Sequence, residues 1–223
     1  MARFLCILIS SGCLISPVQA KESIKLSAGQ YYIFDGDDSH GFTPIGIKYS
    51  TDSYKARIVL PYIENYRGQS GIGNVVIKLS YLTQWKSVYI DVNLRQKLAT
   101  ANEELTLPVS DRGGSIELSH YLYGGIVFAE LGHIWRSSAP SNQSSREDSF
   151  YYALGGMYPL QKKLYSGLVF DHRITALGRL DHIATGFMQY KWSEDTRIGA
   201  SLGKGLKEIS PDWIAGLTWS SKY

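Results

Sequence analysis

Residues 213–223 constrain the fold of this chain more than any other stretch. Successive side chains of a β-strand point to opposite sides, so this segment would have one apolar face and one polar face. The apolar face holds Trp213, Ala215, Leu217, Trp219 and Tyr223. The polar face holds Gly216, Thr218, Ser220 and Lys222. An apolar face with aromatic residues near both ends is typical of a strand that crosses an outer membrane as part of a β-barrel.

The same alternation recurs along the chain and predicts twelve strands. They are expected at about 24–34, 44–50, 54–62, 73–82, 85–95, 113–122, 125–136, 149–158, 164–173, 181–192, 196–203 and 212–223. Short turns are expected at 51–53, 83–84, 123–124, 159–163 and 193–195. Longer connections are expected at 35–43, 63–72, 96–112, 137–148, 174–180 and 204–211. Short periplasmic turns alternating with longer external loops are a feature of bacterial outer-membrane barrels, with both termini in the periplasm.

The predicted fold class is therefore all-β: an antiparallel transmembrane β-barrel of twelve strands, within a range of ten to fourteen. A soluble antiparallel barrel or sandwich shares the period of two and is the alternative. If the strands face lipid, the sheet must close, because an open edge would leave backbone groups unpaired in hydrocarbon.

The first twenty residues read as a secretory signal that precedes a single domain, 21–223. Arg3 supplies a positive start, an apolar run follows, and Val18-Gln19-Ala20 predicts cleavage after Ala20. An anchoring helix and lipidation at Cys13 are the alternatives; the first is short for a span, and the second lacks an aliphatic residue at Ser10.

The bulk composition excludes several classes of function. Both cysteines, Cys6 and Cys13, lie in the signal segment, so the mature chain would have no disulfide, thiolate metal site or cysteine nucleophile. The formal charge of +3 becomes +2 without Arg3, which is too balanced to predict a nucleic-acid partner. Outer-membrane lipid, lipopolysaccharide, the barrel assembly machinery and a small-molecule solute are the expected partners.

Four short motifs, in a fixed order, point to a known family. They are Leu60-Pro61-Tyr62, Gly71-Ile72-Gly73-Asn74-Val75, Gly203-Lys204-Gly205-Leu206 with Ser210-Pro211-Asp212-Trp213, and the end on Gly216 and a terminal aromatic. In these motifs the chain resembles the outer-membrane family labelled "MetA-pathway of phenol degradation". Asn74 stands where that family usually has Asp, and Tyr223 where it has Phe.

The resemblance implies a barrel of about twelve strands that takes up small hydrophobic or aromatic compounds by passive diffusion, without a cofactor. Two other functions remain open from the residues: an enzyme that modifies envelope lipid, and a structural or surface-binding barrel acting through the loops 96–112 and 137–148. No catalytic, cofactor-binding or metal-binding residue is predicted.

If apolar faces meet lipid, their polar partners line the interior. The predicted lining residues are Lys55, Arg57, Lys78, Asp91, Arg95, Glu117, Glu130, Asp171, Arg173 and Arg197. They could set solute selectivity, or they could pair across the interior and plug it. By alternation Tyr121, Tyr151, Tyr165 and Tyr190 could face inward as an aromatic lining, with a place in the aromatic girdles at the membrane interfaces as the alternative for each. The five tryptophans, Trp85, Trp135, Trp192, Trp213 and Trp219, are expected at the membrane interfaces.

Three further patterns bear on enzyme or metal chemistry. Asp171-His172 and Asp181-His182 flank one loop and form the most metal-like pairing, with a hydrogen-bonded loop cluster as the other interpretation. Ser119 and His120 should point to opposite faces, and His133 and Ser137 are poorly spaced for a dyad. The acidic stretch 35–39 offers oxygen ligands but lacks the calcium-loop spacing.

Overall fold

The structure is a computed structural model in which residues 22–36, 38–66, 68–101, 110–137, 148–174, 180–207 and 210–223 are described. The predicted signal segment, 1–20, lies outside these residues, as does most of the loops 96–112 and 137–148. Within the described ranges, no helix is long and apolar enough to cross a membrane.

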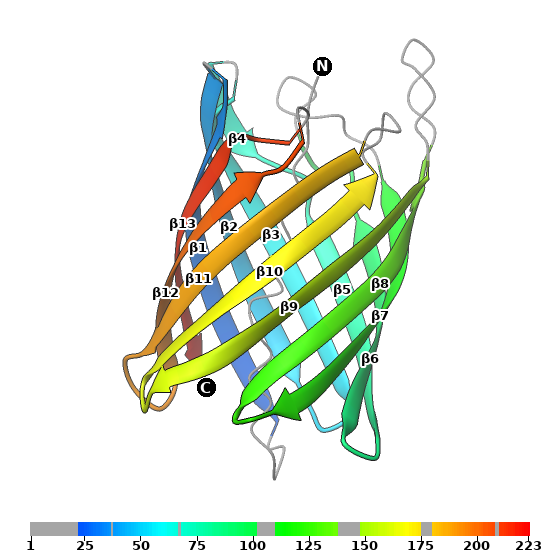
Figure 1. The fold of residues 1–223 in the computed structure, drawn as a ribbon. Coiled ribbons are helices and arrows are strands. Elements are labelled where there is room, and N and C mark those ends of the chain that lie inside the picture. The colour runs from blue at the N-terminus through cyan, green and yellow to red at the C-terminus, as the bar shows by residue number, and fades with distance from the viewer. Residues whose placement is uncertain are drawn as a thin grey trace.

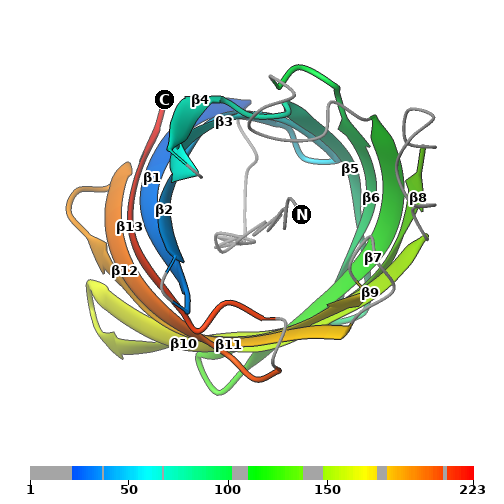
Figure 2. The same ribbon diagram turned by 90° about the horizontal axis from the view of Figure 1, so that it is seen from above.

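Antiparallel strands form a single sheet that closes into a barrel (Figures 1 and 2). The strands are β1 Ser23–Asp35, β2 Asp38–Ser50, β3 Tyr54–Tyr66, β4 Gln69–Ile72, β5 Val76–Trp85, β6 Val88–Lys97, β7 Asp111–Leu122, β8 Gly125–Arg136, β9 Ser149–Gln161, β10 Leu164–Ile174, β11 Leu180–Lys191, β12 Thr196–Gly205 and β13 Trp213–Lys222. Except for the short β4, each has 10–13 residues, enough for a tilted strand to cross a membrane.

The barrel wall has twelve strand positions, which we call staves. This number is as predicted, because β4 and β5 together occupy one stave. Both pair with β3, Tyr62 opposite Ile72 and Val59 opposite Val76. The two registers differ by one residue, so residues 73–75 form a β-bulge. Pro61 lies opposite this bulge and accepts a hydrogen bond from the Gly73 amide at 2.8 Å. A proline fits there because the ladder is already interrupted.

The first and last strands close the ring. β1 pairs with β13 from Lys25–Lys222 to Phe34–Trp213. Beyond the strand end, the Ile24 amide donates to the Tyr223 carbonyl at 3.1 Å and the Tyr223 amide donates to the Ile24 carbonyl at 2.8 Å. Residues 23 and 223 thus lie at the same end of the barrel, which we call the terminal end. We call the opposite end, where Gly36 lies in the turn between β1 and β2, the loop end.

Large hydrophobic side chains cover the outside of the barrel, the reverse of a water-soluble fold. Leu168, Leu217 and Leu94 are 71%, 64% and 63% exposed, while Asn93 and Asp91 on the other face are buried. Four tryptophans lie on the outward faces of their strands, and the fifth, Trp192, directly follows the end of β11. Four of the five lie at or next to a strand end. Such a distribution fits a barrel whose solvent is hydrocarbon outside.

Two of the expected long connections are tight hairpins instead. β1 and β2 continue to the Asp35–Asp38 pair, and β3 and β4 to Tyr66–Gln69, so the predicted loops 35–43 and 63–72 are wrong. Gly36 (φ 62°) and Gly68 (φ 77°) adopt left-handed conformations that glycine permits in a tight turn. The turn expected at 83–84 lies at 86–87, where Lys86 has φ 55° and its carbonyl accepts from the Gln84 side-chain amide at 2.6 Å.

Candidate functional site: the inner wall of the barrel

The strand register decides which side chains line the interior, because residues directly opposite each other in a ladder share a face. Starting from the buried Asn93 and Ser115, the pairings place all nine described lining candidates on the inward face. These are Lys55, Arg57, Lys78, Asp91, Arg95, Glu117, Glu130, Asp171 and Arg197. Arg173 pairs with Asp181 in the backbone ladder, and its side chain lies outside the described residues.

Ion pairs join several of these residues across the wall. Lys55 Nζ lies 2.9 Å from Asp91 Oδ2, and Lys78 Nζ lies 3.9 Å from Glu130 Oε1. Nearer the loop end, Asp111 contacts Lys97 at 2.5 Å and Arg136 at 3.8 Å. Asp111 is among the most buried charged residues described, and a buried charge is stable only when it is paired in this way.

A chain of hydrogen bonds fixes the position of Glu130. Ser80 donates to Asn93 at 2.7 Å, Asn93 donates to Ser115 at 3.2 Å, and Ser115 donates to Glu130 Oε1 at 2.6 Å. The Tyr151 hydroxyl donates to the same carboxylate oxygen at 3.4 Å. Neighbouring strands from β5 to β9 are therefore tied together by side chains as well as by backbone.

Acidic residues occupy one row of the inner wall. Asp91 lies opposite Glu117, Glu117 opposite Glu130, and the row continues through Ala153 to Asp171. We call Asp91, Glu117, Glu130 and Asp171 the acidic row. Arg197 lies on a different part of the wall, where its guanidinium donates to Gln189 at 3.4 Å.

Inward aromatic side chains lie flat on the wall, over glycines of the neighbouring strand. Tyr31 covers Gly216, Phe128 covers Gly155, Tyr151 covers Gly132 and Phe187 covers Gly167; in each pair a methyl group on the glycine would overlap the ring. Covering a strand glycine with an aromatic ring restores packing that the missing side chain would otherwise lose. The rings therefore follow the wall and do not project across the interior.

Three of the four tyrosines that could face inward do so by register: Tyr121, Tyr151 and Tyr165. Tyr190 is on the outward face near the end of β11, which fits the girdle alternative and not the inward one. It pairs with Ile198 and is 43% exposed, alongside Met188 at 48%. In this stretch Gln189 takes the inward position and contacts Arg197.

The two aspartate–histidine pairs do not form a metal site. His172 Nδ1 and His182 Nε2 lie 2.7 Å apart on the outward face, and the Tyr152 ring stacks on His172 at 4.5 Å. Asp171 and Asp181 point to the opposite face, because neighbouring residues of a strand alternate. Nowhere in the described ranges does a group of three or more metal-binding side chains gather.

The serine–histidine combinations are also separated. Ser119 is buried in the inner wall, whereas the His120 ring lies on the outer face, with Nδ1 2.9 Å from the Ser87 carbonyl. The Ser137 hydroxyl donates to the Ser110 carbonyl, and the His133 ring packs on Trp135 at 5.0 Å. Neither arrangement puts a base against a nucleophile.

Asn74, in the second of the four motifs, anchors the chain that follows β6. Its side-chain oxygen accepts the amides of Thr100 at 3.1 Å and Ala101 at 3.2 Å. The Thr100 hydroxyl completes the contact, donating to the Gly73 carbonyl at 3.1 Å and accepting from the Val75 amide at 2.8 Å. Only an acceptor oxygen is required in these bonds, and aspartate would supply one equally well.

The third motif fastens the connection between β12 and β13. The Ser210 hydroxyl donates to the His182 carbonyl at 3.0 Å and accepts from the His182 amide at 3.1 Å. The Asp212 carboxylate accepts from the Gly36 amide at 2.9 Å, which ties this connection to the β1–β2 turn. Lys204 lies over the Trp213 ring at 4.5 Å.

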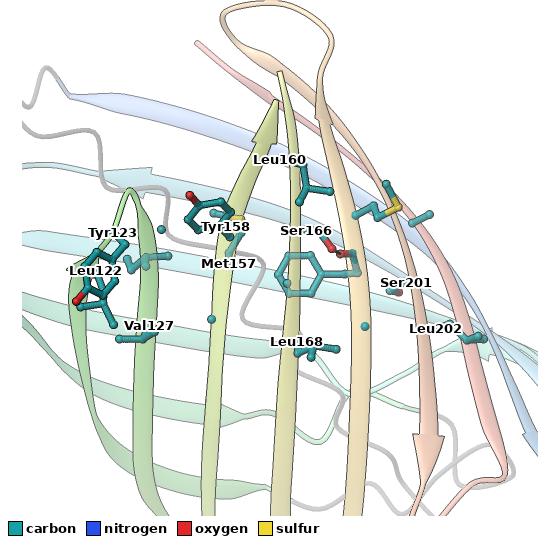
Figure 3. Close-up of a pocket in the computed structure, with 18 residues that line it drawn as sticks. Leu122, Tyr123, Val127, Met157, Tyr158, Leu160, Ser166, Leu168, Ser201 and Leu202 are labelled. Carbon is teal, nitrogen blue, oxygen red and sulfur yellow. Dashed lines mark hydrogen bonds between the residues drawn. The ribbon is translucent and has the colours of Figure 1, made fainter. Parts of the chain in front are cut away.

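A groove of about 1130 Å³ lies on the outer surface, over β8 to β12 (Figure 3). Its floor is formed by small outward residues such as Ser166, Gly186 and Ala200, and Leu168 and Leu202 stand at its sides. The groove is apolar and faces away from the charged inner wall. It is therefore not a path for a solute through the barrel.

Several charged residues of the inner wall are not among the predicted lining residues, although the sequence places Lys222 on the polar face of its strand: Lys25, Lys48, Lys97, Asp111, Arg136 and Lys222. Lys25, Lys48 and Lys222 each stand at an alternating position that a strand assignment could have placed inward. Recognising that they are neighbours requires the register between strands far apart in sequence, which alternation along one strand does not provide.

No protein-family model and no curated protein sequence matches the chain. The fold is similar to that of the COG4313 outer membrane channel from Pseudomonas putida F1, with a TM-score of 0.71, 13% sequence identity, and coverage of 95% of this chain and 99% of that one. The NanC porin follows, with a TM-score of 0.70, 8% identity, and coverage of 90% and 100%. The KdgM porin has a TM-score of 0.60, 9% identity, and coverage of 88% and 98%. The chain thus has the closed, antiparallel, twelve-strand fold of these outer-membrane channels.

Proposed function

We propose that this protein is an outer-membrane channel through which small solutes diffuse into the periplasm. The observation that carries the proposal is the sidedness of the barrel. Large hydrophobic side chains face outward, and most charged residues of the strands, though not Glu64, Arg112 or Lys204, lie on the inward face. A wall of that kind suits lipid on one side and water on the other. The similar folds named above, those of one channel and two porins, support the same role.

In this proposal the first twenty residues are removed on export, and the barrel assembly machinery inserts the chain. Lipid and lipopolysaccharide then surround the apolar belt and fill the outer groove of Figure 3. Both chain termini face the periplasm, and the loop end of the barrel faces the cell exterior. Transport needs no cofactor and no chemical step. Small aromatic solutes, implied by the motif resemblance, belong to the proposed range of cargo.

Planar-bilayer recording and liposome swelling with purified residues 21–223 test the proposal. A channel gives stepwise conductance and lets small sugars equilibrate. Absence of both conductance and solute flux, with a barrel that migrates on gels as a folded species, would exclude transport. The protein would then have to act through its outer surface or its loops.

A further inference from the structure

Six basic residues occupy directly opposed positions across six adjacent staves. Lys222 of β13 pairs with Lys25 of β1, and Lys25 pairs with Lys48 of β2. Lys48 then pairs with Arg57 of β3, Arg57 with Lys78 of β5, and Lys78 with Arg95 of β6. We call these six residues the basic row. All six are on the inward face, and no acidic residue interrupts the row.

The basic row runs obliquely along the inner wall, from the terminal end of the barrel toward the loop end. Lys222 is the last residue of β13 and Lys25 the third of β1, so this end of the row is at the terminal end of the barrel. Arg95 is the eighth of the ten residues of β6, close to the loop end. Barrel strands tilt by roughly 35–45°, so a row perpendicular to them rises from stave to stave. The six cations therefore extend along most of the height of the described wall.

Such an arrangement opposes the stability of the sheet. Like charges on directly opposed strand positions repel each other, and five such pairs follow in succession. Lys78, a member of the row, lies 3.9 Å from Glu130. The ion pairs of Lys55 with Asp91 and of Lys97 with Asp111 belong to neighbouring rows.

The positions of the Arg57 and Lys78 side chains show how members of the basic row lie on the wall. A methyl group at Gly46 of β2 would lie 3.6 Å from both Nε and Nη2 of Arg57. The Arg57 guanidinium therefore lies beside Gly46, leaning along the wall toward β2. Lys78 is 24% exposed in its side chain, so it is neither sealed in the sheet nor fully in solvent.

The opposite charge lies on a different arc of the wall. The acidic row runs over β6 to β10, whereas the basic row runs over β13 to β6. The two rows are four residues apart where they share a strand, at Asp91 and Arg95. A solute inside the barrel thus meets a run of cations on one arc and a run of carboxylates on the next, with a contact between them at Lys78 and Glu130. Charged walls of a low-dielectric channel concentrate counter-ions beside them.

We propose that the basic row is a track along which small organic carboxylates pass through the barrel. The inference rests on the proposed channel function and names the class of its solute. A carboxylate binds lysine as a point charge and arginine as a fork, and neighbouring staves are about 4.8 Å apart. An anion can therefore contact the next cation before it leaves the last. Several weak, closely spaced sites permit conduction where a single strong site would hold the ion.

Matched six-carbon solutes test the track on residues 21–223 in planar bilayers and liposomes. Glucuronate, glucose and glucosamine are similar in size and are anionic, neutral and cationic. Glucuronate is expected to permeate fastest and glucosamine slowest, and the reversal potential in a KCl gradient is expected to show preference for chloride. Conductance without preference for anions would overturn the track and leave the channel proposal intact. A chain that conducts nothing would overturn both.

Variants place the selectivity on the basic row. Arg57→Gln with Lys78→Gln is expected to lower the anion-to-cation permeability ratio by about fivefold for each charge removed. The matched control is Lys204→Gln, which removes one charge from the outer face beside Trp213 and should leave the ratio unchanged. Arg57→Lys with Lys78→Arg keeps both charges and should keep the ratio. Equal ratios for the double glutamine variant and the control, both folded, would contradict the proposal; should that variant not fold, the solute series on the unaltered chain decides.

Discussion

Asn74 holds a loop through one acceptor atom. Its side-chain oxygen receives two backbone amides, those of Thr100 and Ala101, and the residue itself is buried at the β-bulge. The second sequence motif, Gly71 to Val75, includes this position. Both of these bonds need an acceptor oxygen, which asparagine and aspartate supply equally well.

Asn74→Ala leaves the amides of Thr100 and Ala101 without this acceptor. Removing the partner of a buried amide, as that of Ala101 is, costs about 1–3 kcal/mol, so the free energy of unfolding should fall by that amount in urea titrations of the barrel in detergent micelles. Asn74→Asp keeps the acceptor and serves as the control. An alanine variant as stable as the aspartate variant would show that the loop is held by other contacts.

Gly132 provides the space that the Tyr151 ring occupies. Gly132→Ala should displace the ring, disturb its hydrogen bond to Glu130 and destabilise the barrel by about 1–3 kcal/mol, the usual range for overpacking. Truncating the ring, as Tyr151→Ala, removes the overlap. The double variant should therefore lose less stability than the sum of the two single variants, measured by urea titration as a double-mutant cycle. Additive losses would mean that ring and glycine do not interact.

At the scale of elements, the β12–β13 connection joins segments of the loop end that are far apart in sequence. It reaches β11 through Ser210 and the β1–β2 turn through Asp212. Gly205 is required in this connection because a side chain there would overlap the Pro211 carbonyl. Both segments of the third motif, 203–206 and 210–213, thus help to hold the β12–β13 connection in place.

Ser210→Ala removes a hydroxyl that makes two hydrogen bonds to the main chain of His182. Residues 206–212 should then open more often, seen as faster amide hydrogen exchange at Leu206, whose amide donates to the same carbonyl at 2.9 Å. Ser210→Thr keeps the hydroxyl and should keep the protection. Unchanged exchange in the alanine variant would assign the fastening to Asp212 or to backbone bonds instead.

Strand content and sidedness were predictable from sequence, but register and turn position were less so. Alternation placed the nine charged candidates on the polar faces, because the two faces of a strand can be assigned from its own sequence alone. It could not show that Lys25, Lys48 and Arg57 are neighbours, since that depends on how three strands align. Lys86 misled the turn prediction because a lysine with positive φ carries no glycine or asparagine signal. The two tight hairpins at the loop end were missed for a related reason: polar residues within 35–43 and 63–72 resemble loop sequence although they continue the ladders.

At the scale of the whole molecule, the barrel is organised by two solvents. Leu168 and Val169 are adjacent near the middle of β10, and Leu168 faces outward while Val169 faces Thr185 on the inner wall. Arginine at an outward midplane position costs about 2–4 kcal/mol in a bilayer. Leu168→Arg should therefore lower the free energy of unfolding from lipid by about that amount, measured by denaturant titration in vesicles. Val169→Arg, two residues from Asp171, should cost much less and shift ion selectivity. Equal destabilisation by both would argue against hydrocarbon outside.

The pairing of β1 with β13 also has a kinetic consequence. The two strands that seal the ring are separated by nearly the whole described chain, so the first strand to be synthesised must wait for the last. Until β13 is available, β1 has an unsatisfied edge that could recruit a foreign strand. An escort that covers this edge during transit is therefore a requirement of the topology, and it is needed longest by the strand that emerges earliest.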